Sequence, residues 1–129
     1  MLLPSEIEAK AVIPYLRAIV AKRLMEVYNL NQQQVAAKLG VTQAAISNYM
    51  RQTRGKRENW QREREIEMHC DVIASMIANG ADEIDIMERF NRATEFIRKN
   101  RLLCDIHREM EPHYDIESCH ICDKPSSYH

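Results

Sequence analysis

The sequence predicts an all-α fold, and three observations support this prediction. Only 3 glycines occur among the 129 residues, so few positions interrupt a regular helix. Aromatic residues make up 6% of the chain, and residues that favour helices are abundant. Apolar residues also recur every three or four positions, which is the period of an amphipathic helix. The length suits one small domain, or one such domain with an appendage.

The first 28 residues predict two helices. Ser5 and Glu8 stand in the arrangement of a capping box, which predicts a helix that starts just after Pro4. Pro14 is expected to break or restart this helix, because proline lacks an amide donor but suits a first helical turn. From residue 14 to about residue 28, the apolar residues form a helical stripe of Leu16, Ile19, Val20, Leu24 and Val27.

Residues 31–51 predict a helix-turn-helix. Asn31 is a cap for the first helix, and Ala36 is small enough for a second helix to cross it closely. Gly40 stands at the sharp turn, where only glycine enters the left-handed region without steric cost. Thr42 is an N-cap for the second helix, which runs from residue 43 to about residue 51. The side chains expected to face inward are apolar, namely Val35, Leu39, Val41, Ile46, Tyr49 and Met50.

The outward face of that second helix indicates contact with DNA, although an ordinary helical hairpin is the alternative. Short polar side chains, one alanine and one cation suit the base edges of a major groove. Gln32 begins the first helix, where it either holds a phosphate or is simply an exposed glutamine. The basic stretch around Gly55 is expected to be a loop along the sugar-phosphate backbone. The predicted DNA-binding residues are Gln32, Thr42, Gln43, Ala44, Ser47, Asn48, Arg51, Arg54, Lys56 and Arg57.

The charge is distributed unevenly along the chain. The net charge of −1 argues against a nucleic-acid partner when taken alone. Residues 1–66, however, hold 11 Lys or Arg against 6 Asp or Glu, a net charge of +5. Residues 67–129 hold 7 Lys or Arg against 13 Asp or Glu, a net charge of −6. The positive half contains the predicted helix-turn-helix, as contact with phosphates requires.

Two further helices are expected beyond the helix-turn-helix. One spans residues 58–79, with an exposed charged first half, an apolar second half and Gly80 as its C-cap. The other begins after Asp82. Both apolar faces either form a dimerisation layer or complete the core of a monomer, and we favour a homodimer because helix-turn-helix proteins engage paired half-sites. The apolar positions of the second helix are Ile86, Met87, Phe90, Ala93 and Ile97.

The cysteines indicate a metal site. Cys119 and Cys122 form a C-x-x-C pair, and Cys104 and His107 form a C-x-x-H pair. The fourth ligand remains open between His107 and Cys70. A Cys70, Cys104, Cys119 and Cys122 set suits an iron–sulfur cluster or zinc, whereas a set with His107 is a zinc arrangement. The alternative is unliganded thiols on a flexible end.

Residues 31–51 resemble the XRE-type helix-turn-helix of phage repressors and Cro. In that family the residues equivalent to Gln43, Ala44, Ser47 and Asn48 face bases, and the one equivalent to Gln32 clasps phosphate. The matching residues are Gln32, Ala36, Leu39, Gly40, Val41, Thr42, Gln43 and Ile46.

Nearly the whole chain resembles a group of small archaeal predicted transcriptional regulators. The segments that carry the resemblance are MLLPSEIEAKAVIPYLRA, GVTQAAISNYMR, LLCDIHRE and CHIC. The resemblance implies a metal or iron–sulfur segment that tunes DNA binding. A further cysteine that the group often carries is absent between Phe90 and Leu103, so the fourth ligand stays open.

We therefore expect a homodimeric, sequence-specific transcription regulator with an iron–sulfur or zinc centre that makes DNA binding responsive to redox state or metal. The alternative is a protein-interaction module, an antitoxin or adaptor, with structural zinc. The expected segments are 1–57 for DNA binding, 58–101 for linker and dimerisation helices, and 102–129 for the metal. We expect no enzyme, because no nucleophile and base stand together, and no membrane association. A cytoplasmic location follows from the charged N-terminus, which does not fit a signal peptide.

Overall fold

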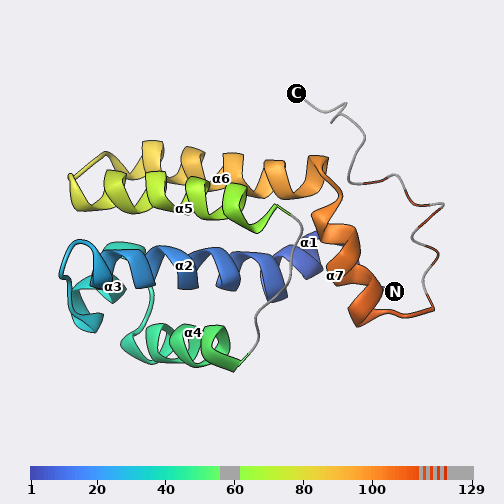
Figure 1. Cartoon of the computed structure of the whole chain (residues 1–129), viewed down its shortest axis with the longest axis horizontal. Helices are drawn as coiled ribbons and strands as arrows, with labels where there is room; N and C mark the ends of the chain where they lie inside the picture. The colour runs from blue at the N-terminus through green and yellow to red at the C-terminus, as the bar shows by residue number, and fades with distance from the viewer. Residues whose placement is uncertain (56–61, 114, 116, 118, 120, 122–129) are drawn as a thin grey trace.

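A helical rod at the N-terminus forms the centre of the fold. The computed structural model describes residues 1–55, 62–113, 115, 117, 119 and 121. The rod consists of α1 (Pro4–Ile7), the π-helical stretch η1 (Glu8–Val12) and α2 (Ile13–Glu26). Helices α3 and α4 lie on one side of α2, and α5 and α6 lie on the other (Figure 1). Every regular secondary-structure element among the described residues is therefore a helix, as the sequence predicts.

The rod differs from the predicted pair of helices in two respects. The amide of Leu3, not of Ser5, donates to a capping carboxylate, Glu6 Oε1, at 3.1 Å, so α1 begins at Pro4 itself. The helical path also continues through Pro14 instead of breaking there. Proline removes one hydrogen bond and crowds the carbonyl four residues earlier, and the wider turn of η1 directly before it gives that carbonyl room.

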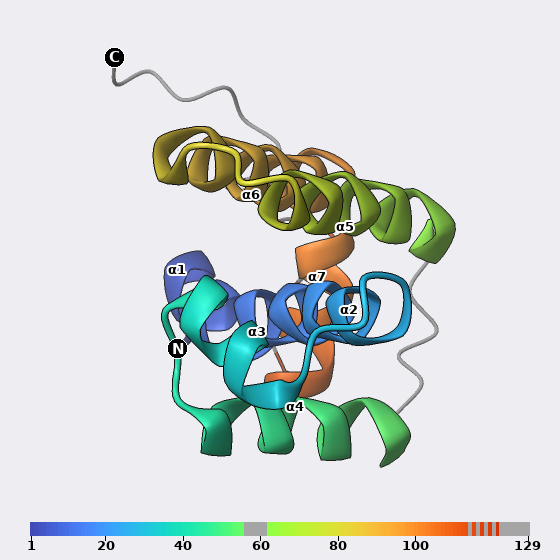
Figure 2. The same cartoon turned by 90° about the vertical axis from the view of Figure 1, so that its left-hand side faces the viewer.

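Helices α3 (Gln32–Leu39) and α4 (Gln43–Gly55) form the predicted helix-turn-helix. They cross beneath α2 in Figure 2, and each packs against both α2 and the other. Val35 and Ile46, one from each helix, are fully buried in the core. Tyr49 and Met50 pack against that core from its edge, as predicted for the inner face of α4.

Helices α5 (Glu63–Ala78) and α6 (Glu83–Lys99) form an antiparallel hairpin. Residues 58–61 of the predicted helix lie outside the described residues. Gly80 has φ +74°, and the amide of Ala81 donates to the carbonyl of Met76 at 2.9 Å, so the left-handed glycine ends α5 as predicted. Helix α5 packs on α2, whereas α6 packs mainly on α5 and the next helix, α7.

Helix α7 (Leu102–Met110) was not predicted, because its residues were interpreted as the start of a cysteine-rich tail. It packs against α1 and α6, close to the N-terminal end of the rod (Figure 1). Leu102, Leu103 and Ile106 are buried, and their spacing places them on one face. One hydrophobic cluster, from Ile7 to Ile106, therefore contains residues of all three expected segments. Among the described helices, none is long and apolar enough to cross a membrane.

Candidate nucleic-acid interface

The start of α3 is fixed by reciprocal hydrogen bonds. The amide of Gln34 donates to Asn31 Oδ1 at 2.8 Å, and the amide of Asn31 donates to Gln34 Oε1 at 2.9 Å. This capping box confirms Asn31 as the cap and makes Gln32 the first residue of α3. The first amides of a helix lack carbonyl partners within the helix and attract anions such as a DNA phosphate.

The turn between α3 and α4 is held by backbone geometry. Gly40 has φ +66°, in the left-handed region, and the amide of Val41 donates to the carbonyl of Ala36 at 3.0 Å. Thr42 Oγ1 then accepts from the amide of Ala45 at 3.1 Å, which confirms Thr42 as the N-cap of α4. These contacts set the angle between the two helices and hold α4 against α3.

Helix α4 separates an apolar inner face from a polar outer face. Ile46 is fully buried, and it anchors the helix to α2 and α3. Four of the five residues predicted for the outward face are exposed, namely Gln43, Ala44, Asn48 and Arg51. An exposed strip with amides, a methyl group and a guanidinium matches the donors, acceptors and thymine methyl groups of a major groove.

Two pairs of the predicted DNA-binding residues contact each other. Ser47 is half-buried, and its hydroxyl donates to Gln32 Oε1 at 3.3 Å. The guanidinium of Arg51 donates to Asn48 Oδ1. The first contact links the start of α3 to the middle of α4, and the second orients two exposed side chains. The spacing of the sequence alone gave no signal of the Gln32–Ser47 contact.

The basic stretch after α4 begins inside the helix and not in a loop. Helix α4 continues to Gly55, so Arg51 and Arg54 both belong to it, contrary to the expected end near residue 51. No proline or glycine interrupts the helix before Gly55, which explains its greater length. Lys56 and Arg57 lie outside the described residues.

Comparison with protein families identifies the domain. Residues 14–84, more than half of the chain, match the ParB HTH domain. The chain belongs to the ParB HTH domain family. The match covers α2, α3, α4 and α5 and establishes a helix-turn-helix DNA-binding protein. Searches of curated proteins and of solved structures found no match. The XRE-type resemblance remains an expectation.

Beyond the ParB HTH domain, three of the predicted metal-ligand candidates line one small cavity. Cys104 and His107 lie one turn apart on α7, and Cys119 lies in the following segment. The cavity measures about 100 Å³, and Leu2 and Leu3 line it from the other side. Arg101 Nη2 donates to the carbonyl of Cys119 at 2.9 Å, which holds this segment against α7. Among the described residues, no three potential ligands already form a metal-binding group, and Cys122 lies outside them.

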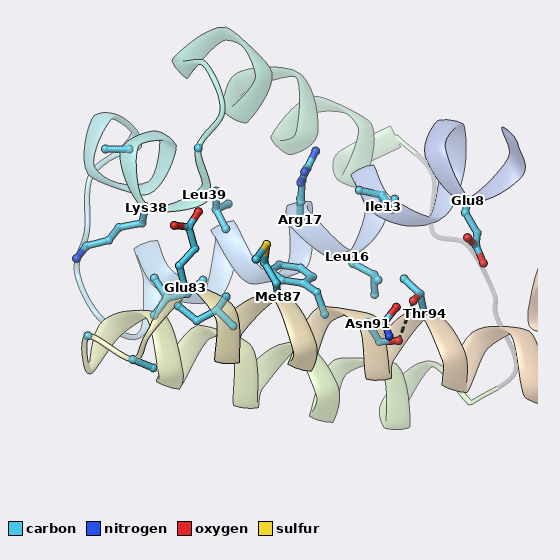
Figure 3. A pocket seen from close by; sticks show the side chains of 17 residues that line it. Glu8, Ile13, Leu16, Arg17, Lys38, Leu39, Glu83, Met87, Asn91 and Thr94 are labelled. Carbon is cyan, nitrogen blue, oxygen red and sulfur yellow. Dashed lines mark hydrogen bonds between the residues drawn. The ribbon is translucent and has the colours of Figure 1, made fainter. Parts of the chain in front are cut away.

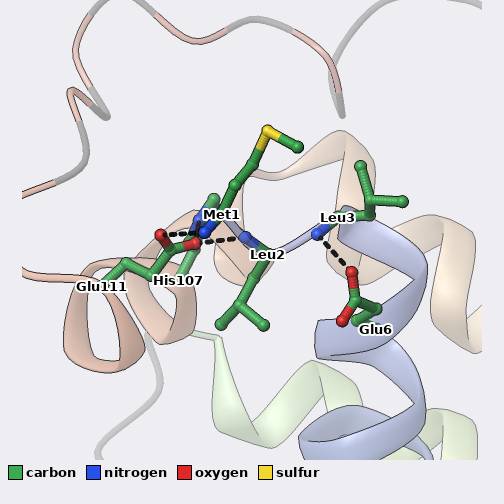
Figure 4. Close-up of polar contacts among 6 residues, drawn as sticks. All are labelled: Met1, Leu2, Leu3, Glu6, His107 and Glu111. Atoms are coloured by element: carbon green, nitrogen blue, oxygen red, sulfur yellow. Dashed lines mark hydrogen bonds and ion pairs between the residues drawn. The ribbon is translucent and has the colours of Figure 1, made fainter.

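Glu111 joins the N-terminus to this cavity (Figure 4). Its Oε1 lies 2.9 Å from His107 Nε2 and accepts from the amide of Leu2, while its Oε2 lies 3.3 Å from the N-terminal ammonium of Met1. The pKa of Glu111 is lowered, and the hydrogen bond with His107 contributes most to this shift. The sequence analysis did not single out Glu111, although its position four residues after His107 on a helix was an available signal.

Cys70, the other predicted ligand, lies inside the ParB HTH domain and is fully buried on α5. Its Sγ lies 3.9 Å from the carbonyl of Leu16, on α2. Burial, assisted by the negative charges of Asp71 and Glu67, raises the pKa of the Cys70 thiol to about 12. Cys70 does not line the cavity of Cys104 and Cys119.

Proposed function

We propose that this protein is a sequence-specific transcription regulator whose α4 enters the major groove. The proposal rests on one observation, the exposed polar strip of α4 on a helix whose inner face is buried. Gln43, Ala44 and Asn48 face the bases, and Gln32 at the start of α3 positions the protein on a phosphate. We infer a cytoplasmic location and a role without catalysis.

Selection of binding sites from random duplex DNA, followed by affinity measurements at several salt concentrations, tests this proposal. Asn48→Ala is expected to cost about 1–3 kcal/mol of binding and to relax specificity at one base pair. Arg51→Ala is expected to lower the salt slope by about one unit. Arg92→Ala, which removes an exposed cation of α6, is the matched control and leaves both quantities unchanged. If no sequence is selected and neither variant changes DNA affinity, the protein-interaction module replaces the regulator.

We also propose that the C-terminal segment binds one metal ion through Cys104, His107, Cys119 and Cys122. The first three line one cavity, which supports His107 over Cys70 as the fourth ligand. Glu111 beside His107 Nε2 fits the carboxylate that commonly orients a ligating imidazole. Three thiolates and one imidazole form a zinc donor set, and the bound ion would clip the segment to α7.

Metal analysis of protein purified without oxygen distinguishes zinc from an iron–sulfur cluster. We expect a colourless protein with about one zinc per chain, a ratio lost in Cys104→Ser and retained in Cys70→Ala. A brown protein with matched iron and sulfide, bleached by Cys70→Ala, would instead establish the four-thiolate cluster. If the protein holds no metal after anaerobic purification and after addition of zinc, the proposed metal site does not exist.

We further propose that the protein acts as a homodimer and that the metal affects DNA binding. Met68 and Val72, one turn apart on α5, are 61% and 42% exposed, which supports an apolar contact between copies. Two recognition helices must lie about 34 Å apart to engage half-sites, and α7 packs on α6, the other helix of the hairpin that carries Met68 and Val72. We expect light scattering to give a dimer that Met68→Glu dissociates. Equal operator affinity with and without metal would make the metal purely structural.

A further inference from the structure

A cleft separates the helix-turn-helix from α6. It has a volume of about 810 Å³ and lies between α2 and α3 on one side and α6 on the other. The hairpin rests on α2 through α5, so the inner face of α6 stands opposite α2 without packing closely on it. Leu16, Leu39 and Met87 extend into this space from three different helices (Figure 3).

The wall of the cleft is mostly apolar. Phe90 and Ile86 of α6 line it together with Ile13 of α2 and Ile77 of α5. Met87 is 56% exposed although it belongs to the apolar stripe of α6, so the cleft leaves a large apolar side chain in contact with water. Volumes of this size with apolar walls and a few polar groups are typical of small-molecule sites.

The charges at the cleft favour an anion. Glu8 already has a partner, because Arg98 Nε lies 3.2 Å from its Oε1. Glu83 lies in the first turn of α6, where the positive end of the helix dipole partly offsets its negative charge. Neither Arg17 of α2 nor Lys38 of α3 forms an ion pair with any described residue. Arg17 is half-buried, and Figure 3 shows its guanidinium on the side of α2 that faces away from α6, so it can meet the acidic end of a ligand that reaches across α2 from the apolar wall.

We propose that this cleft binds a small amphipathic anion, with its apolar body between α2 and α6 and its acidic group at Arg17. One wall of the site is α3, so the ligand contacts both the helix-turn-helix and the C-terminal hairpin. The ligand needs an acidic group to bind Arg17 and an apolar body to contact the wall of the cleft. A neutral molecule of the same shape therefore binds more weakly, and so does a short acid without an apolar body.

Decanoate and decanol are suitable probes, because they share a ten-carbon chain and differ in charge. Calorimetric titration of the full chain at about pH 8 is expected to show that decanoate binds about tenfold tighter than decanol, as one charge-assisted contact implies. Arg17→Gln removes this preference. Met87→Glu weakens decanoate binding by about tenfold or more, because it introduces a negative charge into the apolar wall that holds the body of the anion.

Ile84→Glu is the matched control. Ile84 lies on the same helix, is 59% exposed and does not line the cleft, so its variant keeps decanoate affinity within about twofold. Equal affinities for decanoate and decanol, equal effects of the two glutamate variants, or no binding of decanoate would each overturn the proposal. A dimer that Met87→Glu dissociates, in a protein that binds neither probe, would instead assign the cleft to a second copy of the chain.

Discussion

Replacement of Gly40 by alanine measures how much stability the turn of the helix-turn-helix loses when an L-residue must adopt the left-handed conformation. Gly40 has φ +66° and ψ 32°, and no heavy atom outside its chain neighbours lies within 4 Å of the place where a Cβ would stand. A methyl group therefore meets no steric obstacle from the rest of the fold. The cost of the substitution comes only from holding an L-residue in the left-handed region.

The magnitude follows from two opposing effects. The left-handed conformation costs alanine roughly 1–2 kcal/mol, and the reduced freedom of the unfolded chain returns roughly 0.4–1 kcal/mol. The net loss of unfolding free energy is about 1 kcal/mol, equivalent to a fall of roughly 3–5 °C in Tm for a chain of this size. Asparagine, which tolerates this region better, loses less, and β-branched valine loses more.

Urea unfolding followed by circular dichroism measures the series, and binding to the selected operator is measured alongside. Gly80→Ala is the control, because Gly80 has φ +74° and equally open surroundings at the end of α5. Both alanine variants are expected to lose similar stability, and folded Gly40→Ala is expected to keep its DNA affinity. A loss above about 3 kcal/mol at Gly40 alone, or equal losses for asparagine and valine, would refute the conformational explanation.

Three other measurements follow from side chains that are buried or half-buried. Ile46→Ala is expected to lower the unfolding free energy by about 2–5 kcal/mol, because the fully buried side chain anchors α4, and urea titration checks this value. Burial, and then the charge of Arg89, lower the pKa of His69 below its usual 6.5, so folding favours the neutral form of this imidazole. The neutral imidazole therefore contributes to the unfolding free energy above about pH 6.5, and this contribution is lost as the pH falls from about 6.5 toward the pKa of His69 in the folded protein. His69→Gln is expected to remove this decrease of the unfolding free energy with falling pH. An unchanged decrease in the variant would contradict the role given to His69. Cys70, buried with a pKa of about 12, is expected to react with a thiol reagent only in denaturant, and rapid labelling of native Cys104→Ser, Cys119→Ser, Cys122→Ser protein would disprove its burial.

The sequence predicted those parts of the fold that depend on local chemistry. Asn31 and Thr42 cap their helices through side chains that reach only three residues, and Gly40 adopts a conformation that its own type permits. Such features depend only on residues a few positions apart, so the sequence alone is enough to predict them. The predicted outer face of α4 followed from the same short-range geometry, because a helix period fixes which side chains lie opposite Ile46.

The remaining features depend on contacts between distant segments. Helix α7 was missed because its cysteine and histidine spacing was interpreted as a metal pattern, although Leu102, Leu103 and Ile106 follow a helical period. The continuous helical path through Pro14 depends on the π-helical turn before it, and no residue type in that turn predicts a π-helix. Met87 belongs to an apolar stripe and is nevertheless exposed, because α6 is supported by α5 and α7 and faces a cleft.

The hydrogen bond between Leu2 and Glu111 joins residues separated by 109 positions. Most other helix contacts connect neighbours in the chain, and such contacts form early during folding because they close short loops. The docking of α7 on α1 closes a much longer loop, so it is expected to form last and to open first. Native-state hydrogen exchange would then show the amides of α7 exchanging through a local opening while the α2–α5 core remains protected.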